Sequence, residues 1–396
     1  MKNNFTSFVG IDVSKDKFSY CIINESMEVL KQDELTMNYN GFKSFNNILK
    51  QYENSIIALE STGSYHLNLL SFLTSKKYTV ALINPALIKR FSQTITLRKT
   101  KTDKIDANII AKFILKNLEY VNYFVPTNMD DIVALARVRE NIVRHIAKVK
   151  TQLKQHLAIV FPELVAQYNV FTDSILAILK KLPTPKHVLR VPKSYLKGIF
   201  NELPSKGRKT NLTPEKLIEL AKNSIGVSTE NFAKIIKHDV QMLEFLQKQL
   251  NDLTNDFIDS IRKNKKDDME IISSIKGISS ITSAHFMVEI KSIDRFENAK
   301  KLAAYAGIDP SIRKSGKMYS KGRISKKGSK SLRRCLYLMA SSLIRYNEYF
   351  KKYYDKKRTE GMAHRKAMIA LCNKLVRVLF AMLKKREKFN PVFHNL

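Results

Sequence analysis

Five short apolar segments before residue 85 constrain the fold most. They lie at residues 5–12, 18–23, 27–35, 55–60 and 79–83, and their length and their β-branched and aromatic residues predict strands. Short connections between the first three favour antiparallel hairpins. Helical spacing of apolar residues predicts helices at residues 41–51 and 66–75 and after Thr102. We therefore expect an α/β domain over residues 1–125, with a mixed sheet flanked by helices.

The stretch from Lys99 to Asp106 opens the last of these helices. Thr102 is a suitable N-cap, because its hydroxyl can accept a free backbone N–H of the first turn. Asp103 and Asp106 stand three residues apart in that turn and share one face. Two acids at this position also complement the positive end of the helix dipole, and this effect alone could account for their presence.

Two further acids, Asp12 and Glu60, end apolar strands. Sites in open α/β sheets form outside the carboxyl ends of strands. For either acid alone a role in a turn is the commoner explanation. Four converging carboxylates, however, would repel one another unless divalent cations neutralised them. Mg²⁺ prefers such oxygen ligands, and two metals can activate a nucleophile and stabilise a leaving oxygen. The set of four therefore predicts a two-metal Mg²⁺ site.

The charge of the chain is strongly positive and unevenly spread. The 396 residues contain 69 Lys and Arg against 36 Asp and Glu, a net charge of +33. Residues 1–120 hold 16 basic and 11 acidic residues, a net charge of +5, which leaves +28 for the rest. Such an excess favours a nucleic-acid partner, with a membrane surface as the rival. No apolar run is long enough to span a membrane, the N-terminus lacks a signal-peptide pattern, and the three cysteines are far apart. We expect a cytoplasmic, nucleoid-associated protein.

The middle of the chain, residues 126–265, is predicted to form a helical coiled-coil arm. Apolar residues recur at helical spacing over residues 130–156 and again over 232–261. Two such helices can pair as an antiparallel arm, within one chain or between chains, although ordinary core packing gives the same stripe. Residues 165–225 form an insertion between them, in which the sequence indicates no chemistry.

The last part, residues 266–396, is predicted to be mainly α-helical, with helices at 332–344 and 364–383. Around Gly277 the pattern reads as helix, tight turn, helix. Such a turn can contact phosphates through its N–H groups, and a plain helical hairpin explains it equally well. No acid occurs between Asp309 and Glu348, whereas ten Lys and Arg residues lie from Arg313 to Arg334. This run contains three glycines and is flanked by apolar helices, which favours a phosphate-binding loop over a solvated tail.

Three blocks of the first domain resemble the DEDD insertion-sequence transposases, a group that includes the Piv-type DNA invertases. The blocks are Phe8–Lys15 (FVGIDVSK), Ala58–Tyr65 (ALESTGSY) and Lys99–Ala107 (KTKTDKIDA). The Gly307–Pro310 block, the Ser315–Gly316 loop and the Leu332–Arg334 block resemble the second domain of the same family. Lys317 departs from the small residue expected there.

This resemblance implies a ribonuclease-H-like, RuvC-like first domain and a C-terminal transposase domain. It implies that Asp12, Glu60, Asp103 and Asp106 bind Mg²⁺ and that Ser315 is the nucleophile, with Ser311 and Ser320 as lesser candidates. It also implies donor and target double-stranded DNA, a guide (bridge) RNA and a homo-oligomer, dimer or tetramer, as partners.

The expected function is a transposase, or site-specific DNA recombinase, that cuts and rejoins DNA. A serine hydroxyl needs activation, and no His–Asp pair lies near Ser315, so the carboxylates and their metals are its expected activator. A junction-resolving nuclease would use the carboxylates and water without Ser315, and an architectural nucleic-acid binder would need no converging acids. The residues expected to contact nucleic acid are Lys99, Lys101, Arg313, Lys314, Lys317, Lys321, Arg323, Lys326, Lys327, Lys330, Arg333 and Arg334.

Overall fold

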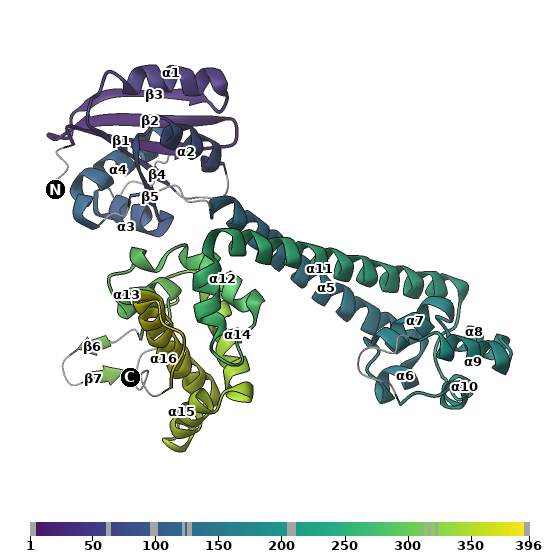
Figure 1. Ribbon diagram of the computed structural model, residues 1–396. Coiled ribbons are helices and arrows are strands. Elements are labelled where there is room, and N and C mark those ends of the chain that lie inside the picture. Colours follow the sequence, from purple (N-terminus) through teal and green to yellow (C-terminus); the bar gives the residue numbers. More distant parts are fainter. Residues whose placement is uncertain are drawn as a thin grey trace. The chain divides into compact units, whose positions relative to one another are not determined.

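The computed structural model describes residues 5–60, 65–95, 102–120, 123–124, 129–203, 211–310, 313–315, 318–320 and 324–391. The chain divides into two compact units, residues 1–127 and residues 128–396 (Figure 1). The described helices include none long and apolar enough to cross a membrane.

The first unit contains the expected mixed sheet of five strands, in the order β3-β2-β1-β4-β5. β1 and β2 pair antiparallel, as do β2 and β3, whereas β1 with β4 and β4 with β5 are parallel. The antiparallel hairpins predicted from the short connections are therefore confirmed. The strands are β1 (Ser7–Val13), β2 (Lys17–Asn24), β3 (Val29–Thr36), β4 (Ser55–Glu60) and β5 (Thr79–Ile83).

Helices cover both faces of this sheet. Successive side chains of a strand point to opposite faces, and here the apolar side chains on both faces are buried. Val9 and Ile11 of β1 pack in one core with α1 (Tyr39–Leu49) and α2 (His66–Ser75). Phe8 packs in the other with α3 (Pro85–Ile95) and α4 (Asp103–Lys116). The sequence pattern did not predict α3. Its first residue is Pro85, and a proline costs nothing there because the first N–H groups of a helix have no partner within it.

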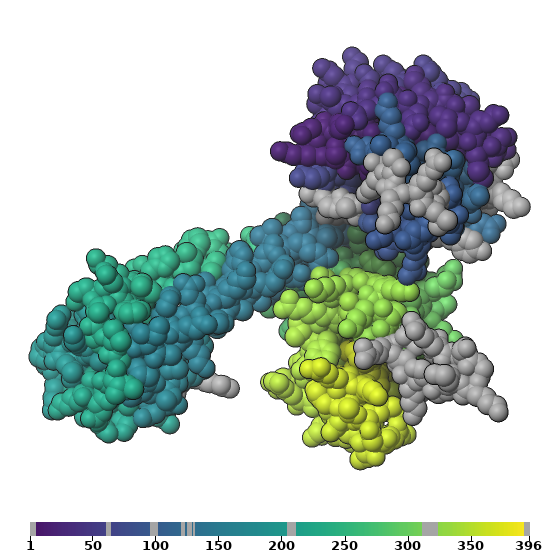
Figure 2. Space-filling model, turned by 180° about the vertical axis from the view of Figure 1, so that it is seen from behind, coloured from purple at the N-terminus to yellow at the C-terminus, as the bar shows by residue number. Residues whose placement is uncertain are grey.

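Two long helices of the second unit, α5 (Asp130–Val160) and α11 (Glu230–Ser273), pack against each other (Figure 1). They run antiparallel, since His156 of α5 contacts Asp239 of α11 at 2.6 Å and Arg139 contacts Thr254 at 2.8 Å. Both extend further than predicted, and α11 has a non-helical residue at Lys265. Figure 2 shows α5, in blue, at the surface of the pair. The paired helices are as expected, while coiled-coil packing stays a prediction.

In the described residues, the segment between these helices forms five short helices around a second hydrophobic core. Thr172, Thr184 and Thr213 each accept a backbone N–H at a helix start, which explains where three of these helices begin. The core joins the insertion to the adjoining ends of α5 and α11. The helices are α6 (Pro162–Gln167), α7 (Asp173–Lys181), α8 (Pro185–Arg190), α9 (Lys193–Asn201) and α10 (Pro214–Lys222).

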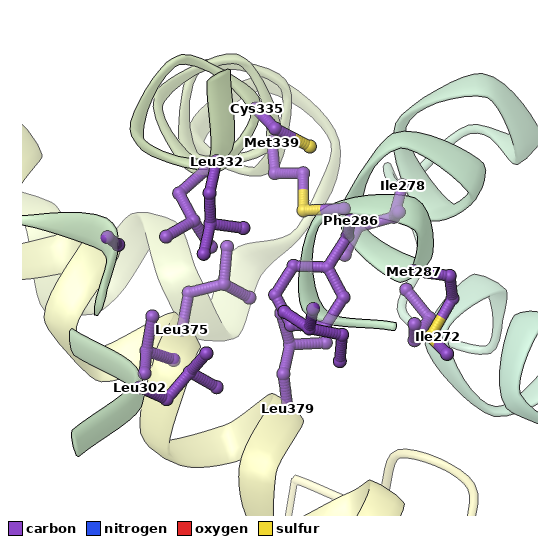
Figure 3. Close-up of a cluster of buried hydrophobic side chains, with 14 of the residues drawn as sticks. Ile272, Ile278, Phe286, Met287, Leu302, Leu332, Cys335, Met339, Leu375 and Leu379 are labelled. Carbon is purple, nitrogen blue, oxygen red and sulfur yellow. The ribbon is translucent and has the colours of Figure 1, made fainter. Parts of the chain in front are cut away.

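The C-terminal part of the second unit packs its five described helices, together with parts of α5 and α11, around one apolar core. Phe286, Met339 and Leu375, from three different helices, meet in it (Figure 3). The helices are α12 (Ser280–Ile290), α13 (Ala299–Ala306), α14 (Lys330–Tyr346), α15 (Glu348–Thr359) and α16 (His364–Lys385). The two helices predicted at 332–344 and 364–383 are confirmed as α14 and α16, and α15 lies between them.

The expected helix, turn, helix pattern around Gly277 is confirmed, with Gly277 at φ +104°. The turn is held against α14, because the Ser342 hydroxyl donates to the Gly277 carbonyl at 2.7 Å. A Cβ on Gly277 would lie 3.2 Å from Cβ of Tyr346. The turn therefore packs against α14, and a contact of its N–H groups with phosphates stays a prediction.

Candidate functional site

Asp12 and Glu60 lie at neighbouring strand ends of the first unit. Ile11 of β1 pairs with Leu59 of β4, and each acid is the next residue along its strand. Because β1 and β4 are parallel, the two carboxylates belong to the same edge of the sheet, where sites form in folds of this kind.

Gly10 shows which face of the sheet Asp12 occupies. A Cβ on Gly10 would lie 2.1 Å from the Ala107 carbonyl oxygen and 2.3 Å from the Ala111 nitrogen, so the backbone of α4 lies directly on β1. Side chains two apart on a strand share a face. Asp12 is therefore on the α4 side of the sheet. By the same alternation Glu60 shares the face of Ala58, which packs in the α4 core.

Asp103 and Asp106 stand in the first turn of α4, as predicted. The Thr102 hydroxyl accepts the Ile105 N–H at 3.3 Å, which confirms the expected N-cap. The Lys104 carbonyl accepts from Gln32 of β3 at 2.6 Å, so the start of α4 lies over the hairpin strands and its later residues cross β1.

Lys17 is a charged neighbour that the sequence pattern did not indicate. Its Nζ lies 2.7 Å from Glu34 Oε2 and 3.8 Å from Asp103 Oδ2. The hydrogen bond to Glu34 is the main cause that raises the pKa of Lys17, with Asp103 adding to it. Val13 pairs with Phe18, so Lys17 lies at the edge of the sheet that Asp12 occupies. The only sequence signal was its place at the start of the hairpin partner of β1.

The four acids offer carboxylate oxygens alone, a donor set that suits a hard cation such as Mg²⁺. Within the described part of the chain, no three His, Cys, Asp or Glu side chains are grouped so that they could hold a metal ion. The structure thus brings Asp12 and Glu60 to one edge and face of the sheet and begins α4 over the same face.

The basic loop of the second unit is clamped at its base. Ser325 N donates to the Asp309 carbonyl at 2.9 Å, Lys326 N to Gly307 at 3.1 Å, and Ser329 N to Tyr305 at 2.7 Å. Beyond this base two short strands, β6 (Arg313–Ser315) and β7 (Met318–Ser320), form a hairpin in which Ser315 pairs with Met318. Ser315 is therefore the last β6 residue before the hairpin turn.

The other residues singled out from the sequence lie in different surroundings. Lys326, Lys327, Lys330 and Arg334 are exposed. Arg333 is half-buried and donates to the Ala306 carbonyl at 2.9 Å, so it supports the base of the loop. Several predicted residues lie outside the described ones: Lys99, Lys101, Ser311, Lys317, Lys321 and Arg323.

A buried polar network next to the loop escaped the sequence analysis. Glu289 of α12 is 4% exposed, and its Oε1 lies 2.5 Å from Arg137 of α5, while the Ser329 hydroxyl donates to its Oε2 at 2.7 Å. Beside it, His285 lies 3.1 Å from Arg139. Burial, with the Arg139 charge next, lowers the pKa of His285 to about 4. The Glu140 charge acts in the opposite direction but is outweighed, so this histidine is neutral at pH 7.

Comparison with known proteins relates both ends of the chain to one group. A family model described as "Transposase" (DEDD_Tnp_IS110) matches residues 9–162, and one described as "Transposase IS116/IS110/IS902 family" matches residues 269–355. The pilin gene-inverting protein of Moraxella bovis is 22% identical over 98% of this chain and 99% of its own length. The insertion element IS116 uncharacterized 44.8 kDa protein of Streptomyces clavuligerus is 22% identical over 97% of this chain and 96% of its own.

One solved structure, "T. thermophilus RuvC in complex with Holliday junction substrate", is 10% identical and covers 30% of this chain and 99% of its own, with a TM-score of 0.25. A likeness of that size carries no weight for the fold. The family models and the relatives that align over nearly the whole length identify the family. The chain belongs to the IS110/IS116 family of transposases and is an enzyme of DNA recombination.

Proposed function

We propose that this transposase cuts and rejoins DNA with Mg²⁺ held by Asp12, Glu60, Asp103 and Asp106. The observation that carries the proposal is the shared edge and face of Asp12 and Glu60, over which α4 begins. Mg²⁺ bound there would stabilise the charge that develops on the attacking and leaving oxygens of phosphoryl transfer. Lys17 offsets part of the negative charge of Asp103 in the absence of the metal.

Ser315 is the proposed nucleophile. Its hydroxyl oxygen attacks the phosphorus of the scissile phosphodiester, and its proton passes to a base. The bond from phosphorus to one sugar oxygen breaks, and that oxygen leaves as a strand-end hydroxyl. The phosphoserine that results conserves the energy of the bond for rejoining. The position of Ser315 at the hairpin turn, on a base clamped by backbone hydrogen bonds, supports this role.

The basic excess outside the first domain supports nucleic-acid partners for the same reaction. We propose donor and target double-stranded DNA, a guide RNA that bridges them, and a homo-oligomer that holds both. Exposed Lys326, Lys327, Lys330 and Arg334 next to the hairpin fit contacts with phosphates. A division into domains at residues 125 and 265, with a ribonuclease-H-like first domain, belongs to the same proposal.

The metal site is tested with Asp103→Asn, which removes a charge and little volume. We expect loss of Mg²⁺-dependent strand cleavage, with DNA binding and the unfolding temperature nearly unchanged. Glu53→Gln is the matched control, because it removes one negative charge from an exposed position of the same unit. Full cleavage by Asp103→Asn would refute the proposed metal site.

The nucleophile is tested with a nicked suicide DNA substrate, followed by mass spectrometry of the linked peptide. We expect a DNA adduct on Ser315, none with Ser315→Ala, and an unchanged adduct with Ser320→Ala. An adduct that persists in Ser315→Ala assigns the nucleophile to another residue. Cleavage by the wild-type chain without any adduct would favour the junction-resolving nuclease, which uses water.

A further inference from the structure

The part of α5 that follows Glu140 carries several basic residues and no acidic residue. Between Glu140 and Glu163 the sequence contains no Asp or Glu, but it contains Arg144, Lys148, Lys150 and Lys154. Arg144, Lys148 and Lys154 are exposed, on the helix that Figure 2 shows in blue along the surface. Arg144 and Lys154 are about 15 Å apart along the helix axis at 1.5 Å per residue.

These cations differ in ion pairing from other lysines of the second unit. Lys180 pairs with Glu244 at 2.7 Å, Lys181 with Glu202 at 2.5 Å, and Lys216 with Glu219 at 3.1 Å. In the part of the chain that the structure describes, Lys148 and Lys154 have no ion pair. Lys150 and Lys154 stand four residues apart and share one face of α5. Cations left without acids attract a polyanion.

An aromatic ring adjoins Lys150 and Lys154. A groove of about 370 Å³ is lined by Lys150, Thr151, Lys154, Gln155, Ala158 and Phe171. Phe171 is half-buried, and the Lys150 ammonium lies 5.4 Å from the centre of its ring. A flexible lysine over an open ring face can move aside, so a flat base can stack on the ring while the ammonium meets its phosphate.

We propose that this groove binds an unpaired nucleotide of a nucleic-acid strand, with its base on Phe171 and neighbouring phosphates on Lys150 and Lys154. The ring favours an unpaired strand, because the bases of a duplex are stacked on one another and do not offer a free face. Unpaired DNA and RNA share this chemistry. The inference does not depend on the proposed metal site or nucleophile.

The chain contains no tryptophan, so Phe171→Trp introduces a fluorophore that reports on this groove alone. The full-length variant is titrated with a short oligothymidylate, with an oligouridylate of equal length, and with a blunt duplex. We expect saturable quenching by one or both single strands and little by the duplex, and the two single-strand arms identify the source. Stacking of this kind is worth roughly a tenfold gain in binding or more.

Lysine variants in the Phe171→Trp background separate site binding from general charge. Lys150→Gln with Lys154→Gln should weaken the quenching titration about tenfold or more and lower the salt slope by about 0.7 per lost phosphate contact. Lys181→Gln with Lys216→Gln removes the same charge from ion-paired positions and should change the quenching titration little. Absence of quenching at oligonucleotide concentrations that saturate binding to the chain would overturn the proposal, as would equal quenching by the duplex.

Discussion

A methyl group at Gly10 should separate α4 from the sheet. In Gly10→Ala the new Cβ would meet the Ala107 carbonyl oxygen at 2.1 Å and the Ala111 nitrogen at 2.3 Å. Both atoms belong to the helix backbone, so no side chain can rotate away and α4 itself must move. Overpacking of this kind costs about 1–3 kcal/mol, and contact with backbone places this variant at the upper end or beyond.

The assay is thermal unfolding of the full chain, followed by circular dichroism. For a unit of this size, 1 kcal/mol corresponds to about 3–5 °C, so the transition of the first unit should fall by roughly 10 °C. Strand cleavage should fall as well, because α4 carries Asp103 and Asp106 and is seated on β1, the strand that carries Asp12.

Gly198→Ala in α9 is the matched control. A Cβ there would meet nothing within 4 Å, and alanine is the better helix former by about 0.5–1 kcal/mol, so stability should rise slightly. An unchanged unfolding temperature for Gly10→Ala would refute the close seating of α4 on β1.

Two further predictions concern the network beside the basic loop. Glu289→Gln should lower the free energy of unfolding, measured by chemical denaturation, by about 1–3 kcal/mol, which is less than for a fully buried pair because the Arg137 side chain is 40% exposed. The control is Asp294→Asn, which breaks a surface pair with Lys384 and should cost under about 1 kcal/mol. Equal costs for the two variants would contradict the argument. His285 has a folded pKa of about 4 against an ordinary 6.5, so the unfolded chain binds the extra proton between those values and stability should fall as pH falls from 6.5 to 4. His285→Gln should flatten that part of the stability profile, and an unaltered profile would show that other groups cause it.

Local patterns were enough for most elements of the first unit. β4, α2 and β5 have the predicted bounds, and Thr102 caps α4 as expected, because strand alternation, apolar spacing and a cap depend on neighbours in sequence. Asp12 and Glu60 were found for the same reason: each follows an apolar run, and its place at a strand end is a local property.

Only the tertiary structure decided which groups meet. Strand periodicity is the same on both faces, so the face that Asp12 occupies became known only from the helix backbone that lies on Gly10. Lys17 and Asp103 are far apart in sequence and come within 3.8 Å because α4 begins over the hairpin. Arg333 was predicted to contact phosphate, and the structure adds a contact that the pattern did not indicate, from its guanidinium to the Ala306 carbonyl. Local pattern determines an element, whereas the partner of a charge depends on contacts that pattern does not encode.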